Sequence, residues 1–232
     1  ESINSPSCQS NVFYQTSKTG LLVLLGRVSE AMQCIDDADR RGLRPRQYVL
    51  ESKATTLLLI KKYDVIKVAQ SLDDIGALFQ EALRIENKEG SASRFPIYYA
   101  GLAEVALRKG NFDEAEKLIK IAIELDSDSP SQYYSLAGVV ASRQKRWNQA
   151  LQFLEMSIKK NKDNYLSEDE TIRALAEAFC NIGRNDLAAQ AVSLAISEHP
   201  IIARAPDIVE AQRVVNNCTV AKSSMNKGLT SQ

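Results

Sequence analysis

One phrase occurs three times in this chain of 232 residues, and its spacing limits the fold more strongly than any other feature of the sequence. The copies align on Ala115, Ala150 and Ala188, so they are separated by 35 and then 38 residues. Each alanine is followed by an aliphatic residue four positions later, a small residue seven positions later and isoleucine eight positions later. In chain order these are Ile119, Leu154 and Val192, then Ala122, Ser157 and Ala195, then Ile123, Ile158 and Ile196, while Gly110, Lys145 and Gly183 stand five positions before the alanines. A period near 34 residues with such punctuation predicts an array of two-helix repeats.

The hydrophobic pattern is helical along nearly the whole chain. Residues 112–125 place apolar side chains at steps of three and four, which predicts one amphipathic helix. Short polar segments interrupt the pattern at residues 26–27, 42–45, 88–93, 126–130, 160–164 and 199–200. No alternating segment of strand length is present in the sequence. The predicted fold class is therefore all α.

The helices that precede the repeated phrase carry large, small and aromatic residues in a constant order. The residues are Tyr99, Leu102 and Ala103 before Gly110, then Tyr134, Ala137 and Gly138 before Lys145, then Ile172, Leu175, Ala176 and Phe179 before Gly183. In this order and spacing, residues 96–200 resemble the tetratricopeptide repeats. The resemblance implies a right-handed superhelical solenoid of antiparallel helix pairs, with about five repeats and a C-terminal capping helix.

Weaker copies of the pattern extend the expected array toward the N-terminus. The same spacing recurs at Gly26, Ala31, Ile35 and Ala38. The last positions of another second helix are occupied by Phe79, Ala82 and Leu83, and the first helix of that pair is expected at residues 46–62. The expected organisation is a flexible leader at 1–11, divergent repeats at 12–90, three clear repeats at 91–202, a capping helix at 203–220 and a disordered tail at 221–232.

Composition and motifs argue against several classes of function. Lys plus Arg and Asp plus Glu are 29 each, so no overall charge favours nucleic acid or an anionic membrane. The longest apolar run, residues 21–25, is far shorter than the roughly 20 residues of a membrane span, so no membrane insertion by this chain is expected. His199 is the single histidine, and no glycine-rich phosphate loop is present. We therefore expect no enzyme activity, no metal and no cofactor.

Charged residues cluster around residue 40. Asp36, Asp37 and Asp39 form an acidic group whose spacing matches no calcium loop, so a solvated helix face is the favoured interpretation over a cation site. Arg40, Arg41, Arg44 and Arg46 follow directly. Charge balance at a helix C-terminus is the favoured interpretation for these arginines, with an anionic partner as the alternative.

The four cysteines show no paired C-x-x-C motif, so a zinc site is not expected. If the repeats stack in register, Cys180 and Cys218 come close enough to bridge, and Cys8 is similarly placed to join Cys34. Free thiols packed as small hydrophobic residues remain the alternative. The chain begins without methionine, which favours a bacterial periplasm or envelope location after removal of a signal, with the cytoplasm as the alternative.

The resemblance implies that the first helices of the repeats line a concave groove in which peptides bind. The inward positions would be Ile97, Ala100, Glu104, Leu107, Arg108, Gln132, Ser135, Val139, Ser142, Arg143, Glu170, Arg173, Glu177, Cys180 and Asn181. A wetted inner wall with no ligand is the alternative. Relatives that hold chaperone tails have a carboxylate clamp of Lys and Asn at the positions of Ala100 and Glu104, so no such clamp is expected here.

These observations predict a non-enzymatic scaffold or adaptor whose partner is another protein or peptide. Assembly or secretion of a multiprotein complex is the expected setting, with the bacterial envelope as one location. Two alternatives stay open: a docking or regulatory arm of a larger enzyme or regulator, and a self-associating homo-oligomer.

Overall fold

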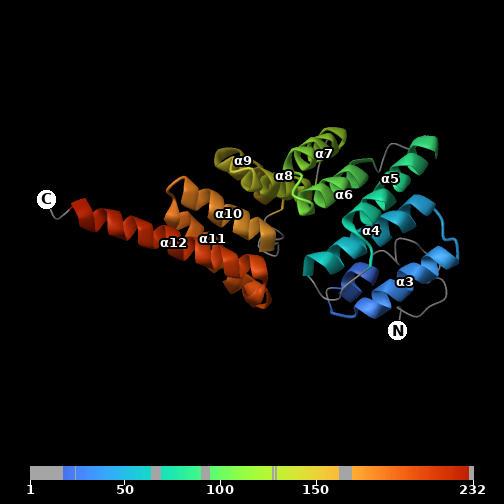
Figure 1. The fold of residues 1–232 in the computed structure, drawn as a ribbon, viewed down its shortest axis with the longest axis horizontal. Coiled ribbons are helices and arrows are strands. Elements are labelled where there is room, and N and C mark those ends of the chain that lie inside the picture. The colour runs from blue at the N-terminus through green and yellow to red at the C-terminus, as the bar shows by residue number, and fades with distance from the viewer. Residues whose placement is uncertain are drawn as a thin grey trace. The chain divides into compact units, whose positions relative to one another are not determined.

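The structure is a computed structural model in which every regular element is a helix (Figure 1). It describes residues 18–23, 25–63, 69–89, 95–126, 128, 130–161 and 169–229. Within these ranges the chain forms helices joined by short turns, and no strand occurs among them. The predicted all-α class is therefore confirmed. The leader at 1–11, with Cys8, lies outside the described residues.

The chain divides into two compact units, residues 1–125 and 126–232. The first unit contains a short helix at residues 18–23, then α3 (Val28–Arg40), α4 (Arg46–Tyr63), α5 (Leu72–Glu89), α6 (Phe95–Arg108) and α7 (Phe112–Leu125). The second contains α8 (Ser131–Arg143), α9 (Trp147–Lys160), α10 (Asp169–Asn181), α11 (Asn185–Glu198), the 3-10 helix η3 (Pro200–Arg204) and α12 (Pro206–Leu229). Consecutive helices pack as pairs, α4 with α5 and α6 with α7 in the first unit, α8 with α9 and α10 with α11 in the second.

The aligned positions of the repeated phrase are the buried positions of the second helices. Ala115, Ala150 and Ala188 are completely buried in α7, α9 and α11, and the residues four and seven positions later are buried with them. Helices α3 and α5 bury residues at the same spacing, namely Ala31, Ile35 and Ala38, then Ile75, Phe79 and Ala82. In α3, α7, α9 and α11 small residues at the first and third positions allow the paired helix to approach closely, and this explains why the pattern recurs there.

The turns between paired helices also repeat. Gly110 and Gly183 have φ values of 77° and 81°, and Lys145 at the equivalent turn has a φ of 60°. Left-handed backbone of this kind is the usual conformation just after a helix C-terminus, and glycine adopts it without steric cost. The chain therefore reverses direction by the same backbone geometry in all three repeats, even where lysine replaces glycine.

The last helix differs from the predicted boundaries. α12 begins at Pro206, after η3, and continues to Leu229, so residues 221–229 are helical although a disordered tail was expected from residue 221. No proline occurs after Pro206, and a helix already nucleated by packing gains one hydrogen bond for each residue it adds. The polar composition that suggested a tail therefore did not determine where the helix ends.

The charged cluster near residue 40 joins α3 to α4. Asp39 accepts hydrogen bonds from Arg46 and from Lys53 Nζ, the latter at 3.3 Å, while Asp37 pairs with Arg40 one turn away on α3. Burial alone would raise the pKa of the Asp39 carboxyl, but the bonds from Arg46 and Lys53 outweigh it and lower that pKa. Arg40 lies in the last turn of α3, as the charge-balance interpretation expects, but Arg46 begins α4. Asp39 is half-buried and bonded to α4, so the interpretation as a solvated helix face is wrong for this residue.

We expect the contribution of Asp39 to stability to depend on pH. A carboxyl whose pKa is lower in the folded state stabilises the fold above its unfolded pKa, about 4, and this stabilisation is lost as the pH falls through the folded pKa. Asp39→Asn should therefore lower the free energy of unfolding by about 1 kcal/mol or less at pH 5–7, and the difference from wild type should shrink below about pH 4. Urea unfolding at four pH values measures it. Asp36→Asn, at an exposed position of the same helix, is the control; an equal pH profile for both variants would contradict the assignment.

Candidate protein-binding surface

In the first unit, the predicted groove positions lie on α6 and show different exposure. Ile97 and Ala100 are half-buried, whereas Leu107 is buried. The side chains of Glu104 and Arg108 are 22% and 16% exposed and form an ion pair one turn apart on α6. The acidic and basic residues predicted to face a ligand here are therefore bonded to each other. Leu107 lies in the protein interior, which corrects its predicted position on the surface.

In the second unit, the predicted positions divide into open and closed sets. Gln132 and Asn181 are exposed, Arg143, Glu170, Arg173, Glu177 and Cys180 are half-buried, and Ser135, Val139 and Ser142 are buried. The buried serines form bonds between repeats. Ser135 contacts the Thr171 hydroxyl of α10, and Ser142 donates a hydrogen bond of 2.9 Å to Glu177 Oε2. Ser135, Val139 and Ser142 are therefore not open to a ligand, because packing between α8 and α10 occupies these positions.

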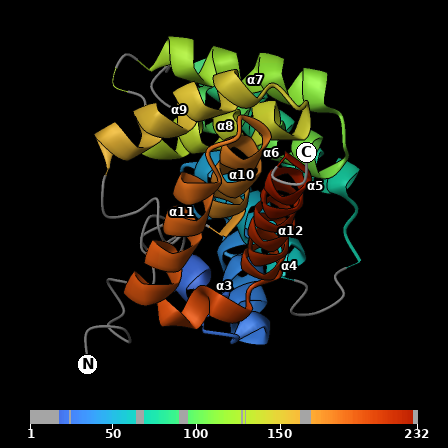
Figure 2. The same ribbon diagram turned by 90° about the vertical axis from the view of Figure 1, so that its left-hand side faces the viewer.

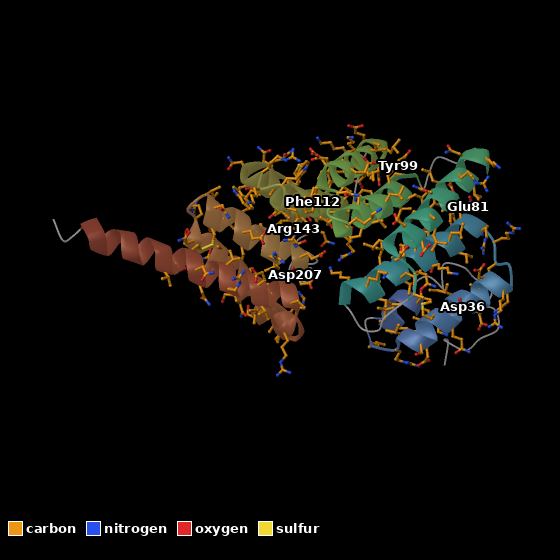
Figure 3. The ribbon with its side chains drawn as sticks, in the orientation of Figure 1. Asp36, Glu81, Tyr99, Phe112, Arg143 and Asp207 are labelled. Carbon is orange, nitrogen blue, oxygen red and sulfur yellow. A yellow bond between two sulfur atoms is a disulfide. The ribbon has the colours of Figure 1, made fainter. Side chains whose placement is uncertain are left out.

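Four charged side chains from α8, α10 and α12 meet in the second unit. Arg173 donates from Nε to Glu177 Oε1 at 2.8 Å and from Nη1 to Asp207 Oδ1 at 3.0 Å. Arg143 Nη1 lies 3.6 Å from Glu177 Oε1, and its Nη2 lies 3.8 Å from Asp207 Oδ1 (Figure 3). We call Arg143, Arg173, Glu177 and Asp207 the inner charge network. It contains two cations and two anions and is therefore electrically neutral.

The inner charge network raises the pKa of Arg173. Burial alone would lower the pKa of Arg173, but hydrogen bonds to Glu177 and Asp207 outweigh it and raise that pKa. All four side chains are between 15% and 27% exposed, so their mutual attraction is screened less than that of fully exposed pairs. The network therefore fixes the three helices that carry it, α8, α10 and α12, against one another.

Sequence reasoning missed Asp207, which was assigned only to a capping helix. A signal was nevertheless present, because Arg143 and Glu177 are 34 residues apart and so are Arg173 and Asp207. Residues one repeat apart occupy equivalent positions on neighbouring first helices. Opposite charges at that separation therefore predict contact across the repeat boundary, and α12 behaves here as the first helix of a further repeat.

A disulfide joins α10 and α12 farther along the two helices. Cys180 of α10 and Cys218 of α12 are bonded, with their Cα atoms 5.9 Å apart (Figure 3). This is one of the two disulfides that the sequence analysis considered. Cys34 is half-buried on α3 and is a free thiol. The expected bond from Cys34 to Cys8 stays a prediction, since Cys8 lies outside the described residues.

Metal and membrane sites were sought in the part of the chain that the structure describes. It contains no group of three or more His, Cys, Asp or Glu side chains placed to hold a metal ion. His199 is half-buried between α11 and η3. No helix in the described ranges combines the length and the apolar character that crossing a membrane requires.

Comparisons with known proteins agree with this architecture. Residues 99–133 match the family model of the tetratricopeptide repeat. TTC0263, a thermophilic TPR protein of Thermus thermophilus, is 17% identical; the alignment covers 88% of this chain and 99% of that one, with a TM-score of 0.64. YrrB, described as a TPR protein with an unusual peptide-binding site, is 12% identical with a TM-score of 0.48, and the alignment covers 88% and 93% of the two chains. No curated protein matches the sequence significantly.

The family match covers a single repeat, whereas the likeness to TTC0263 covers most of both chains and concerns the fold. The two helix pairs that follow, α8 with α9 and α10 with α11, bury the same positions in their second helices and turn through the same backbone conformation. Residues 99–133 therefore match the tetratricopeptide repeat model, and the likeness to TTC0263 shows that most of the chain has the same fold.

Proposed function

We propose that this chain is a non-enzymatic scaffold that binds an extended segment of another protein along the first helices of the second unit. The observation that carries the proposal is the inner charge network, which ties α8, α10 and α12 into one surface. Binding to a surface that is already ordered costs less entropy than binding to one that must first be arranged. Three first helices held in register supply such a surface.

The chemistry of this surface favours a partner segment of low net charge. The inner charge network is neutral, and the exposed predicted positions on α8 and α10, Gln132 and Asn181, are amides that donate and accept hydrogen bonds. In the first unit the Glu104–Arg108 pair is neutral as well. A strongly acidic tail would find no unpaired cation among these positions, which agrees with the absence of a carboxylate clamp expected from Ala100 and Glu104.

The setting we propose is the assembly or secretion of a multiprotein complex in an oxidising compartment. The Cys180–Cys218 disulfide supports an oxidising compartment, because such bonds persist in the periplasm and outside the cell and are rare in the cytosol. The bacterial envelope meets this condition.

A displayed library of random 12-residue peptides tests the proposed surface. Peptides are selected on the wild-type chain, and their affinities are then measured for two variants of equal added charge. Gln132→Arg with Asn181→Arg changes the proposed surface, whereas Gln152→Arg with Gln190→Arg changes exposed positions of the second helices α9 and α11. We expect the first variant to lose about tenfold or more in affinity, since two hydrogen-bonding contacts that the bound peptide covers are removed, and the second to match wild type. Equal affinities for the two variants, or no peptide enriched at all, would refute the proposal.

A further inference from the structure

Among the side chains of α12 that the structure describes, those of residues 206–220, the completely buried ones lie in the first two turns. Ile208 and Ala211 are completely buried where α12 packs on α10 and, to a smaller extent, on α11 (Figure 2). From residue 212 to residue 220 no side chain of α12 is buried, and Val220 at the end of this stretch is 66% exposed. The helix nevertheless continues to Leu229. Within residues 206–220, complete apolar burial is therefore limited to the first part of α12, and Val214 and Val215 are half-buried.

A second attachment lies farther along the helix. Cys218 is bonded to Cys180 of α10, and its backbone oxygen accepts a hydrogen bond of 2.8 Å from the side-chain amide of Asn185 of α11. At a rise of about 1.5 Å per residue, Cys218 is roughly 15 Å along the helix axis from Ile208. Asp207, at the start of α12, accepts a hydrogen bond from Arg173 of α10. The two ends of this stretch are thus fixed by different chemistry, ionic and apolar at the first turn and covalent at Cys218.

We propose that the Cys180–Cys218 disulfide is a redox-sensitive anchor that keeps the distal part of α12, residues 212–229, docked on the second unit. With the bond intact, the distal part is held beside α10. With the bond reduced, residues 206–211 stay docked through Ile208, Ala211 and Asp207, whereas the distal part has no buried side chain between residues 212 and 220 to retain it. A helical stretch with no completely buried side chain is only marginally stable in water, so the released segment unfolds locally.

The change requires a dithiol reductant. One thiolate of the reductant attacks Sγ of either cysteine and forms a mixed disulfide, and the other cysteine leaves as a thiolate. The second thiolate of the reductant then displaces the bound cysteine. Two electrons pass from the dithiol to the protein, Cys180 and Cys218 each take up one proton, and the dithiol becomes a cyclic disulfide. Both cysteines are half-buried rather than enclosed, so a small dithiol has access to them.

Release of the distal part changes the surface between α11 and α12. An open hollow of about 480 Å³ lies between these helices and is lined by Val192 and Ile196 of α11 and by Val215 of α12, among others. Val215 belongs to the part that the reduced protein releases. Reduction therefore removes one side of the hollow and exposes apolar side chains of α11, while the inner charge network at the start of α12 stays formed.

Hydrogen–deuterium exchange with mass spectrometry on the full chain tests this inference, with and without dithiothreitol. We expect backbone exchange in peptides from residues 212–229 to become about tenfold faster or more on reduction, and exchange in residues 206–211 and in α8 and α9 to stay the same. The double variant Cys180→Ser with Cys218→Ser should show the fast exchange without reductant. Cys34→Ser is the matched control and should respond to dithiothreitol as wild type does.

Three results would overturn the inference. The first is unchanged exchange at residues 212–229 after intact mass has confirmed reduction. The second is a uniform rise over the whole second unit, which would make the bond a general stabiliser of that unit. The third is quantitative alkylation of Cys180 and Cys218 in protein purified without reductant. Because the reduction arm uses the wild-type chain, the test does not depend on whether the serine variant folds.

Discussion

Gly138→Ala should destabilise the wild-type chain by about 1–3 kcal/mol and should stabilise a chain that also carries Leu154→Ala. Gly138 lies on α8 where α9 crosses it most closely. A Cβ atom built on Gly138 would be 2.5 Å from Leu154 Cγ, 2.6 Å from Leu154 Cδ2 and 3.3 Å from the Ala150 carbonyl oxygen. Leu154 is completely buried, so its side chain has no free space into which to move. The two helices must separate to admit a methyl group, and this cost exceeds the gain of about 1 kcal/mol in helix propensity.

The second substitution reverses the sign because it removes the atoms that cause the clash. Leu154→Ala alone should cost about 2–5 kcal/mol, through lost burial and the cavity left behind. In that background the methyl group added by Gly138→Ala enters the cavity, and both the packing and the propensity terms then favour alanine. Urea unfolding of the four chains completes a double-mutant cycle, and the coupling energy should be strongly favourable.

Gly76→Ala serves as the control for this cycle. Gly76 is also helical, but the nearest atom to its Cβ would be Val105 Cγ1 at 3.6 Å, an ordinary contact. This variant should therefore be neutral or stabilised by up to about 1 kcal/mol. If Gly138→Ala behaves like Gly76→Ala in the wild-type background, α8 and α9 do not approach as closely as the structure shows. Gly76 and Gly138 lie in different compact units, so the unfolding curves are fitted without assuming a single transition.

The parts of the fold that follow from short-range periodicity could be predicted from the sequence. Residues 112–125 form α7 with the predicted bounds, because one apolar stripe and the polar residues at both ends define a helix locally. Gly138 was assigned to the small slot of its repeat because the order of large and small residues recurs in three copies. This periodicity involves only residues of one helix pair, and these residues are close together in the sequence.

The parts that depend on contacts between repeats were harder to predict. Ser135 and Ser142 were placed on the open surface because the family resemblance assigns their positions to the groove, yet the structure buries them against α10, where they contact Thr171 and Glu177. Asp207 was overlooked because its partner Arg173 is one full repeat away. Hydrophobic pattern identifies the face of a helix that packs, but it does not show which polar side chains on neighbouring helices satisfy each other.

Arg173→Ala should lower the free energy of unfolding of the second unit by about 1.5–3 kcal/mol, the usual range for lost hydrogen bonds to charged groups. The Arg173 side chain is 27% exposed and bonds to carboxylates on two helices, Glu177 on α10 and Asp207 on α12. Its removal leaves both carboxylates partly buried, with Arg143 at 3.6 Å and 3.8 Å as the remaining cation of the network. Arg143 alone then faces two carboxylates, so one negative charge of the partly buried network is left uncompensated.

Arg213→Ala is the matched control, because Arg213 also pairs with a carboxylate but does so within α12, with Glu210 one turn away, at 67% exposure. We expect no measurable change in stability for this variant. Adding Asp207→Asn to Arg173→Ala should restore part of the loss, since one of the two unpaired carboxylates is then neutral. Both comparisons are made by urea unfolding at low and high salt, and the loss caused by Arg173→Ala should persist in high salt more than an exposed pair would allow. Equal stability of the two alanine variants would mean that the inner charge network does not hold α8, α10 and α12 together. The proposed binding surface would then not be ordered in advance, and binding a peptide to it would cost more entropy.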